Sequence, residues 1–346
     1  MSKVVVVGDA FVAVDTLKRA AESMGLPEPL EIVMLEWHGE DSPEEFQRNL
    51  KLIEEHGPES VDLPEGIMKE IADAEYLFVH LAPVTRQMLE SAEKLKLIGT
   101  CRGGVEHIAV DSAREKDIPV IHVIRNAEPV ADYTIGLIYT VTRNIALSHA
   151  AVMQGKWPKK FPNDAYRTTL SEQTVGLVGL GHIGKMVAQR LISLGVNVIA
   201  YDPFIDQKKV LASGLELRFV SLEELFTEAD IVSLHMRVTP ETEKLVDEKL
   251  LELMKPNAYL INTARPGILD KEAFIDVLKK RKIAGAAIDV VWQEPMHSDD
   301  PLLDLDNLVI TSHIAGDTVD AIPNSPFLLA RKVREYVKTG ESEFII

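Results

Sequence analysis

Glycines at positions 179, 181 and 184 carry the clearest chemical signal in the sequence. They stand in the spacing Gly-x-Gly-x-x-Gly within Thr174–Gly184, where a short apolar run turns into a helical pattern. In such a turn Gly179 permits the tight bend, Gly181 lets a pyrophosphate approach the backbone, and Gly184 lets the helix pack closely on the strand. The N–H groups and the dipole at the start of a helix stabilise phosphates. The stretch therefore predicts a dinucleotide site.

An acidic residue beyond the glycines indicates which dinucleotide is bound. A second apolar run, Val196–Ala200, is followed by Tyr201 and Asp202, and Asp202 lies 202 − 184 = 18 residues after Gly184. A carboxylate at about 20 residues accepts hydrogen bonds from the ribose hydroxyls and repels a 2′-phosphate, so the pattern favours NAD over NADP. Lys208 and Lys209 keep the NADP alternative open, as does a purely structural role for Asp202 in its turn.

A second set of candidate residues follows three other apolar runs. Arg265 follows Tyr259–Ile261, His313 follows Leu308–Thr311, and two carboxylates follow Ile283–Ile288, namely Asp289 and Glu294. The carboxyl ends of parallel strands meet at the edge where ligands bind. There an arginine binds a carboxylate, a histidine exchanges a proton near neutral pH, and an acidic residue orients the histidine. Each residue alone is more often structural, but together they predict a catalytic edge.

A third candidate site lies in the first third of the chain. Arg102, Gly103 and Gly104 follow the apolar run Leu97–Thr100. Two adjacent glycines allow backbone N–H groups to face an anion, so we expect the acid group of a substrate here. An ordinary loop is the alternative.

The order of the segments predicts the architecture. A chain of 346 residues is long enough for about two domains, and strand-like runs alternating with helical patterns predict doubly wound parallel sheets. A long helix is expected over Tyr133–Gln154. The first turn, Gly8-Asp9-Ala10-Phe11, lacks the glycine triplet, so the first half is expected to be α/β without a phosphate site. Further strands are expected at Val4–Val7, Ile32–Leu35, Tyr76–Leu81, Val120–Val123 and Ile231–Leu234.

Composition narrows the possible partners and surroundings. With 37 basic and 54 acidic residues, the net charge of −17 disfavours nucleic acid and anionic membranes. No apolar run approaches the roughly 20 residues of a membrane span, and a lone Cys101, expected in the core, points to a reducing cytoplasm. The acidic stretch between Glu36 and Glu75 lacks ligand spacing, so no metal site is expected. The basic residues from Lys156 to Arg167 fit a substrate phosphate, a partner subunit or solubility equally well.

The motifs together resemble the D-isomer-specific 2-hydroxyacid dehydrogenase family, and within it most closely the D-3-phosphoglycerate dehydrogenase-like branch. The matching segments are Gly179–Gly184 with Asp202, Asn262–Arg265, Asp289 through Pro295, and Ser312–Gly316, within a resemblance running from Leu97 to Val333. Membership implies an α/β fold with two Rossmann-like doubly wound parallel-sheet domains flanking a cleft, usually as a homodimer. From the order of segments, residues 1–125 plus 317–346 form a discontinuous, flavodoxin-like substrate (catalytic) domain. Residues 126–316 form the NAD-binding Rossmann domain.

The resemblance also implies roles for individual residues. Arg265 binds the substrate's carboxylate and carbonyl groups, His313 is the general acid and base, and Glu294 pairs with His313. Gly103 and Gly104 face the substrate. The implied NAD contacts beyond the glycine turn and Asp202 are His182, Ile183, Thr263, Ala264, Asp289 and the segment His313–Gly316.

Three functions are consistent with these residues. The first is an NAD-dependent oxidoreductase acting on a D-2-hydroxy acid, with D-3-phosphoglycerate and its keto acid as one pair and glyoxylate, hydroxypyruvate or a sugar-derived acid as others. The second is a related enzyme for formate, disfavoured because formate enzymes of this family carry glutamine where Glu294 stands. The third is a non-catalytic NAD(H)-sensing module like the family's corepressors, which the acidic charge disfavours.

Overall fold

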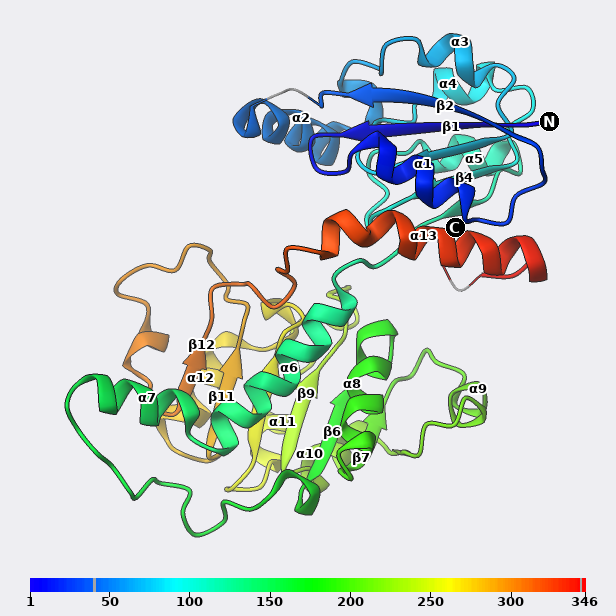
Figure 1. Ribbon diagram of the computed structural model, residues 1–346. Coiled ribbons are helices and arrows are strands. Elements are labelled where there is room, and N and C mark those ends of the chain that lie inside the picture. Colours follow the sequence, from blue (N-terminus) through cyan, green and yellow to red (C-terminus); the bar gives the residue numbers. More distant parts are fainter. Residues whose placement is uncertain (40–41, 343) are drawn as a thin grey trace. The chain divides into compact units, whose positions relative to one another are not determined.

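The computed structural model describes residues 1–39, 42–342 and 344–346. It divides into two compact units, one formed by Met1–Arg125 with Thr318–Ile346 and the other by Asn126–Asp317. Each unit is a parallel β-sheet with helices on both faces (Figure 1), as the sequence predicted. Among the described residues, none of the helices combines the length and apolarity needed to span a bilayer.

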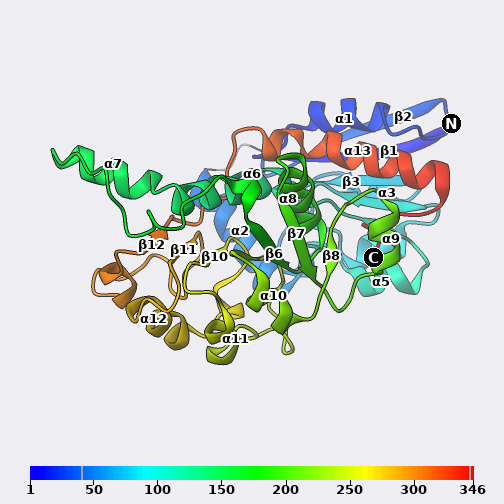
Figure 2. The ribbon, with the colours of Figure 1, turned by 90° about the horizontal axis from the view of Figure 1, so that it is seen from below.

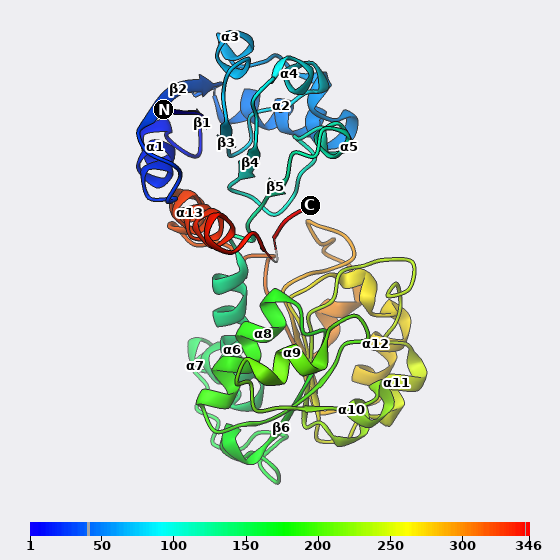
Figure 3. The same cartoon turned by 90° about the vertical axis from the view of Figure 1, so that its right-hand side faces the viewer.

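In the described part of the first unit, five parallel strands follow the order β2-β1-β3-β4-β5. Alternate valines of β1 explain its central position: Val4 and Val6 pack towards one helix layer, whereas Val5 and Val7 pack towards the other. Helices α1 and α13 cover one face and α2 to α5 the other (Figure 3). The strands are β1 (Ser2–Asp9), β2 (Leu30–Trp37), β3 (Tyr76–Val79), β4 (Leu97–Thr100) and β5 (Val120–Ile121). The helices are α1 (Val14–Glu22), α2 (Pro43–His56), α3 (Ile67–Ile71), α4 (Arg86–Ser91), α5 (Val110–Glu115) and α13 (Ala321–Thr339).

Residues 126–317, all of them described, form a seven-stranded parallel sheet in the order β12-β11-β10-β9-β6-β7-β8. The chain runs outwards from β6 to β8 and then returns to β9 on the other side of β6, so the carboxyl ends of β6 and β9 mark the switch point where such sheets bind ligands. The strands are β6 (Thr174–Val178), β7 (Asn197–Tyr201), β8 (Arg218–Phe219), β9 (Ile231–Leu234), β10 (Tyr259–Asn262), β11 (Gly285–Ile288) and β12 (Leu308–Ile310). The helices are α6 (Ala127–Thr142), α7 (Ile145–Met153), α8 (His182–Ser193), α9 (Gln207–Ala212), α10 (Leu222–Glu228), α11 (Glu248–Leu253) and α12 (Lys271–Lys279).

One predicted helix is wrong in its extent. The pattern over Tyr133–Gln154 suggested a continuous helix, but α6 ends at Thr142 and α7 begins at Ile145. Asn144 interrupts them with a φ of 56°, in the left-handed region that asparagine tolerates better than most residues. Its side-chain amide is buried and donates a hydrogen bond to Oδ1 of Asn163 at 2.7 Å. A contact across the fold, which the local pattern does not contain, therefore breaks the helix.

The same contact belongs to a buried network that fixes the carboxyl end of α6. The Nδ2 group of Asn163 donates to the carbonyl oxygen of Thr142 at 3.0 Å and to the hydroxyl of Tyr259 at 2.8 Å. Burial raises the pKa of Tyr259 to about 12, so its hydroxyl is neutral at pH 7. Asn163 thus joins α6, the bend at Asn144 and strand β10.

The variant Asn163→Ala tests this network. We expect it to lower the free energy of unfolding by about 3 kcal/mol, because it leaves the buried groups of Asn144, Thr142 and Tyr259 without their partner. Urea unfolding followed by circular dichroism measures the loss. The control Asn197→Ala removes an exposed side-chain amide that donates to the hydroxyl of Thr174, and a loss of the same size there would contradict the argument.

Candidate functional site

The glycine turn after β6 has the shape that a pyrophosphate requires. Gly179 has a φ of +96°, and a Cβ there would lie 2.9 Å from the carbonyl oxygen of His235. A Cβ on Gly184 would lie 2.3 Å from the carbonyl oxygen of Gly179, whereas nothing lies within 4 Å of the corresponding point on Gly181. The turn is thus closed on the protein side and open at Gly181. This cradle fits the phosphates of a dinucleotide.

The helix that follows the turn presents its N-terminus to the same place. Helix α8 begins at His182 after Gly181, and within the fully described range 126–317 no side chain caps it. Its first backbone N–H groups therefore suit an anion. Ile183 and His182 are half-buried at this end of the helix, and their contact with NAD stays a prediction.

Asp202 lies at the end of β7, next to the turn. Its carboxylate accepts hydrogen bonds from the backbone N–H of Leu180 at 2.8 Å and of Phe204 at 2.9 Å. The side chain thus holds the glycine turn in place, and it is half-buried, not enclosed. Its contact with ribose hydroxyls stays a prediction.

His235 closes the switch point from the β9 side and was not predicted as a site residue. Its backbone N–H donates to the carbonyl oxygen of Val178 at 2.8 Å, and its ring contacts the hydroxyl of Ser233 through Nε2 at 3.0 Å. Burial lowers the pKa of His235 to about 4, so the ring is neutral at pH 7. The rule that ligands bind at carboxyl strand ends, applied to β9 as well, would have found it.

The loop after β10 is shaped by a buried asparagine. Asn262 accepts a hydrogen bond from the N–H of Ala264 and donates one to the carbonyl oxygen of Arg265, both at 3.0 Å. Thr263 bonds the hydroxyl of Thr134 on α6 at 2.8 Å. These contacts fix the loop backbone, while the Arg265 side chain stays exposed. The guanidinium is therefore available to an anionic ligand.

Asp289 fixes the neighbouring loop. Its carboxylate is buried after β11 and accepts hydrogen bonds from the hydroxyl of Thr311 at 2.6 Å and from the N–H groups of Ile314 at 3.1 Å and Ala315 at 2.8 Å. These three groups surround His313, so Asp289 sets the path of the backbone at that residue. Its predicted contact with NAD is untested, but its positioning of the His313 loop is direct.

His313 and Glu294 form the predicted pair. Nδ1 of His313 donates to Oε2 of Glu294 at 2.7 Å, and both side chains are partly exposed. The hydrogen bond from His313 lowers the pKa of Glu294, and the N–H of Val291 and the charge of Arg265 lower it further. His313 itself has a φ of 58°, an unfavourable conformation for a residue with a side chain and one that is frequent at active sites.

The structure therefore assembles Arg265, Glu294 and His313 on one edge of the second sheet, together with the glycine turn. Gly316 lies in the same unit, where a Cβ would approach the Nδ2 atom of Asn126 to 3.2 Å. The predicted substrate residues Arg102, Gly103 and Gly104 belong to the first unit, after β4. Their role in binding substrate stays a prediction.

A doubly wound sheet with an open glycine turn at its switch point defines a dinucleotide-binding α/β protein. Residues 135–315 match the family model described as "D-isomer specific 2-hydroxyacid dehydrogenase, NAD binding domain". The matched range covers more than half of the chain, which belongs to this family. Its cofactor domain is accordingly the NAD-binding domain of that family.

Curated relatives carry two different names. The chain is 36% identical over 304 residues to the D-3-phosphoglycerate dehydrogenase of Methanocaldococcus jannaschii, covering 86% of this chain but 57% of that protein. It is 38% identical over 291 residues to the glyoxylate reductase of Thermofilum pendens, covering 81% of this chain and 84% of that protein. The chain thus spans only about half the length of the phosphoglycerate dehydrogenases it matches, 57% and 51% for two of them.

Solved structures agree on the fold. A protein of Thermus thermophilus is 28% identical with a TM-score of 0.62, and 99% of each chain is covered. The NAD-complexed D-isomer specific 2-hydroxyacid dehydrogenase of Lactobacillus delbrueckii has a TM-score of 0.71 at 22% identity over the whole of both chains. At that identity the likeness shows the fold alone.

A methyl group added inside the glycine turn tests whether the turn binds the cofactor. We expect Gly184→Ala to weaken NADH binding at least about 10-fold, because the added methyl group would displace the Gly179 carbonyl and open the turn. Fluorescence titration with NADH measures the loss. The control Gly136→Ala adds a methyl group to α6 where nothing lies within 4 Å. Unchanged affinity in Gly184→Ala would show that the turn does not hold the cofactor.

Proposed function

We propose that this protein is an NAD-dependent dehydrogenase that interconverts a D-2-hydroxy acid and its 2-keto acid. The observation that carries the proposal is the 2.7 Å hydrogen bond between Nδ1 of His313 and Glu294, beside the exposed guanidinium of Arg265. Because Nδ1 is engaged, Nε2 is the ring atom that can exchange a proton with a substrate hydroxyl. Bound NAD supplies the hydride chemistry itself.

Each of the three side chains has a separate task in this reaction. Arg265 binds the substrate carboxylate through its planar fork and draws electron density from the carbonyl oxygen. His313 gives a proton to that oxygen during reduction and removes it during oxidation. Glu294, which stays ionised because its pKa is lowered, keeps the ring oriented and stabilises the imidazolium form. Asp289 holds the loop that carries His313.

The proposal assigns the remaining predicted residues to the same reaction. The turn at Gly179, Gly181 and Gly184 takes the pyrophosphate, and Asp202 takes the ribose and disfavours NADP. The unit 126–317 serves as the NAD domain and the other unit as the substrate domain, through the turn Arg102–Gly104. The fully buried Cys101 fits an enzyme of the reducing cytoplasm. The relatives' names favour both a phosphorylated acid and a small unphosphorylated one.

Oxidation of NADH with a panel of 2-keto acids tests the proposal. The panel contains phosphohydroxypyruvate, hydroxypyruvate, glyoxylate and pyruvate, with NADPH run in parallel. We expect turnover with at least one of them, and His313→Ala to reduce kcat by about 1,000-fold or more while the affinity for NADH changes little, because the ring moves the proton and does not hold the cofactor. Turnover retained in His313→Ala would contradict the assignment.

We also propose that the protein is a homodimer formed through α7. None of the residues of this helix is buried, although most of them are apolar. Its last residue, Met153, is 73% exposed, and Trp157 beyond the helix is 74% exposed. In Figure 2, α7 extends away from the sheet of its own unit. A nine-residue helix is not stable in water on its own. A self-complementary contact with a second copy would cover it, as in most two-fold symmetric dimers.

Charge placed on this helix should separate the copies. We expect the wild type to sediment as a dimer and Val152→Glu with Met153→Glu to sediment as a monomer, because two carboxylates would be buried in the contact. Analytical ultracentrifugation measures the mass of each. The control Leu211→Glu changes another exposed apolar residue, on α9. A wild type that is monomeric at micromolar concentration would contradict the dimer.

A further inference from the structure

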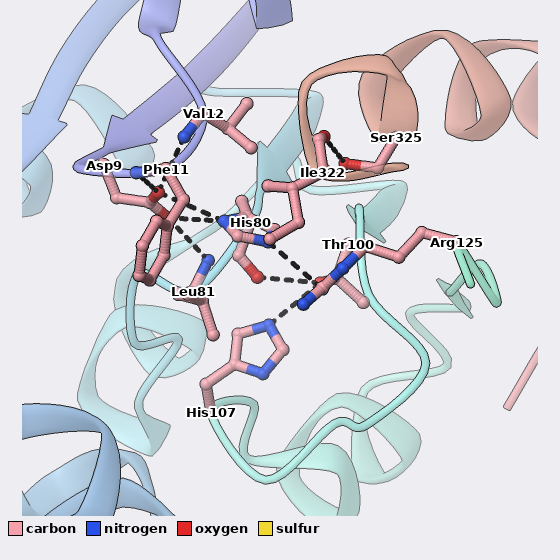
Figure 4. Close-up of polar contacts among 10 residues, drawn as sticks. All are labelled: Asp9, Phe11, Val12, His80, Leu81, Thr100, His107, Arg125, Ile322 and Ser325. Atoms are coloured by element: carbon pink, nitrogen blue, oxygen red, sulfur yellow. Dashed lines mark hydrogen bonds and ion pairs between the residues drawn. The ribbon is translucent and has the colours of Figure 1, made fainter. Parts of the chain in front are cut away.

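A chain of buried polar groups lies at the carboxyl ends of β1 and β3 in the first unit (Figure 4). The carboxylate of Asp9 accepts hydrogen bonds from the N–H groups of Phe11 at 2.9 Å, Val12 at 3.0 Å and Leu81 at 3.0 Å. It also accepts one from Nδ1 of His80 at 3.0 Å, and neither side chain is exposed. Asp9 thus uses the N–H groups of Phe11 and Val12 in the first turn, which leaves these two groups unavailable to a phosphate.

The other ring nitrogen of His80 contacts an arginine. Because a guanidinium can only donate, Nε2 of His80 accepts the hydrogen bond from Arg125 at 3.2 Å, and the ring proton is on Nδ1, which donates to Asp9. A buried arginine is usually paired with a carboxylate, but the partner of Arg125 is the uncharged Nε2 atom of an imidazole. It fixes the position of the guanidinium without cancelling its charge, and the carboxylate of Asp9 remains one ring width away.

Arg125 is therefore a half-buried cation without a close counter-ion. Over residues 1–39, 42–342 and 344–346, no ion pair joins it to an aspartate or glutamate. Burial lowers the pKa of Arg125 and the charge of Arg102 lowers it further, whereas the charge of Asp9 acts in the opposite direction. A guanidinium nevertheless stays protonated at pH 7. The positive charge of Arg125 is therefore poorly compensated, and an anion that binds beside it would compensate that charge.

The neighbouring Arg102 differs in this respect. Its guanidinium lies 3.4 Å from Glu106 and 3.9 Å from Glu54. The Glu106 carboxylate also covers the glycine turn, since a Cβ on Gly104 would lie 2.3 Å from its Oε2 atom. The turn at Arg102, which the sequence predicted as the anion site, therefore already carries carboxylates.

Arg125 stands next to that turn. The carbonyl oxygen of Arg102 accepts a hydrogen bond from the N–H of Val123 at 3.2 Å, and a Cβ on Gly103 would lie 3.8 Å from the Ile124 side chain. The segment leading to Arg125 thus packs along the turn at the carboxyl end of β4. Of the two arginines at this edge of the sheet, Arg102 has carboxylate partners. Arg125 has none among the described residues, so an anion that binds here does not have to displace a carboxylate from it.

We propose that Arg125 binds an anionic group, a phosphate or a carboxylate, that the substrate carries in addition to the carboxylate of a 2-hydroxy acid. Asp9 and His80 are positioning residues that hold the guanidinium. This inference rests on the proposed dehydrogenase function and specifies its substrate class. One N–H of the guanidinium is used by His80, and the planar fork offers others for a bidentate contact with an oxyanion.

The test compares keto acids that differ only in a second anionic group. The pairs are phosphohydroxypyruvate against hydroxypyruvate for phosphate, and oxaloacetate against 2-oxobutanoate for carboxylate. We expect Arg125→Gln to lower kcat/KM about 30-fold or more for the member of one pair that carries the second anion, through KM. Hydroxypyruvate or 2-oxobutanoate should change less than about 2-fold. The pair that responds identifies the anion.

Two further variants separate binding from folding. Arg114→Gln removes an exposed arginine of the same unit that pairs with Asp111 and should behave as wild type. Arg125→Lys keeps the charge without the fork and should restore part of the affinity. His80→Phe keeps an aromatic ring but loses both Nε2 and the Nδ1 donor to Asp9, and should raise KM for the same substrate with kcat unchanged. Equal losses on both members of a pair, or no loss, would overturn the proposal.

The anion site at Arg125 can be tested even if the protein proves not to be a dehydrogenase. If the wild type reduces no keto acid, thermal unfolding with and without inorganic phosphate, at roughly 10 to 50 mM, gives an independent readout. A phosphate-dependent rise in the Tm of the wild type that is absent in Arg125→Gln and present in Arg114→Gln would support an anion site at Arg125. Identical shifts in all three proteins would overturn it.

Discussion

The geometry of the catalytic edge depends on one buried carboxylate, that of Asp289. It accepts hydrogen bonds from the hydroxyl of Thr311 and from the N–H groups of Ile314 and Ala315. A carboxylate is buried at a cost that only several good donors offset. Once these bonds are made, the loop has little freedom, and His313 is held at a positive φ that a loop free to relax would avoid. The pairing of His313 with Glu294 follows from this constraint.

The first unit also has a buried carboxylate that fixes loops at the carboxyl ends of its strands. Asp9 is also a buried carboxylate at the carboxyl end of a strand, but its backbone donors lie on two loops, after β1 and after β3, whereas the donors to Asp289 all lie on the loop after β12. The two differ in what they hold. Asp289 fixes the backbone on which a partly exposed histidine stands, whereas Asp9 fixes the ring of His80 directly, out of solvent. One arrangement leaves its histidine partly exposed, and the other holds its histidine out of solvent against an arginine.

Motifs with local physical requirements could be predicted from the sequence, and contacts across the fold could not. The glycine turn, the strands and the residues Arg265, Glu294 and His313 follow from spacing and from the rule that ligands bind at carboxyl strand ends. The break at Asn144 depends on Asn163, 19 positions away, and the hydrogen bond of Asp289 to Thr311 spans 22 positions. Asp9 ends β1, and His80 follows β3 in the structure. The predicted strand Tyr76–Leu81 contained His80, so the rule for carboxyl strand ends could not single it out from the sequence.

Charge explains why arginines with different neighbours matter in this protein. A net charge of −17 repels a small anion at long range, so binding must come from short contacts with cations that are not already neutralised. Arg102 has two glutamates beside it, and an anion approaching it must compete with them. Arg265 donates through Nη1 to the carbonyl oxygen of Ala264, and Arg125 donates to the imidazole of His80. Both are oriented by groups that carry no charge, which preserves the positive potential that a carboxylate partner would remove.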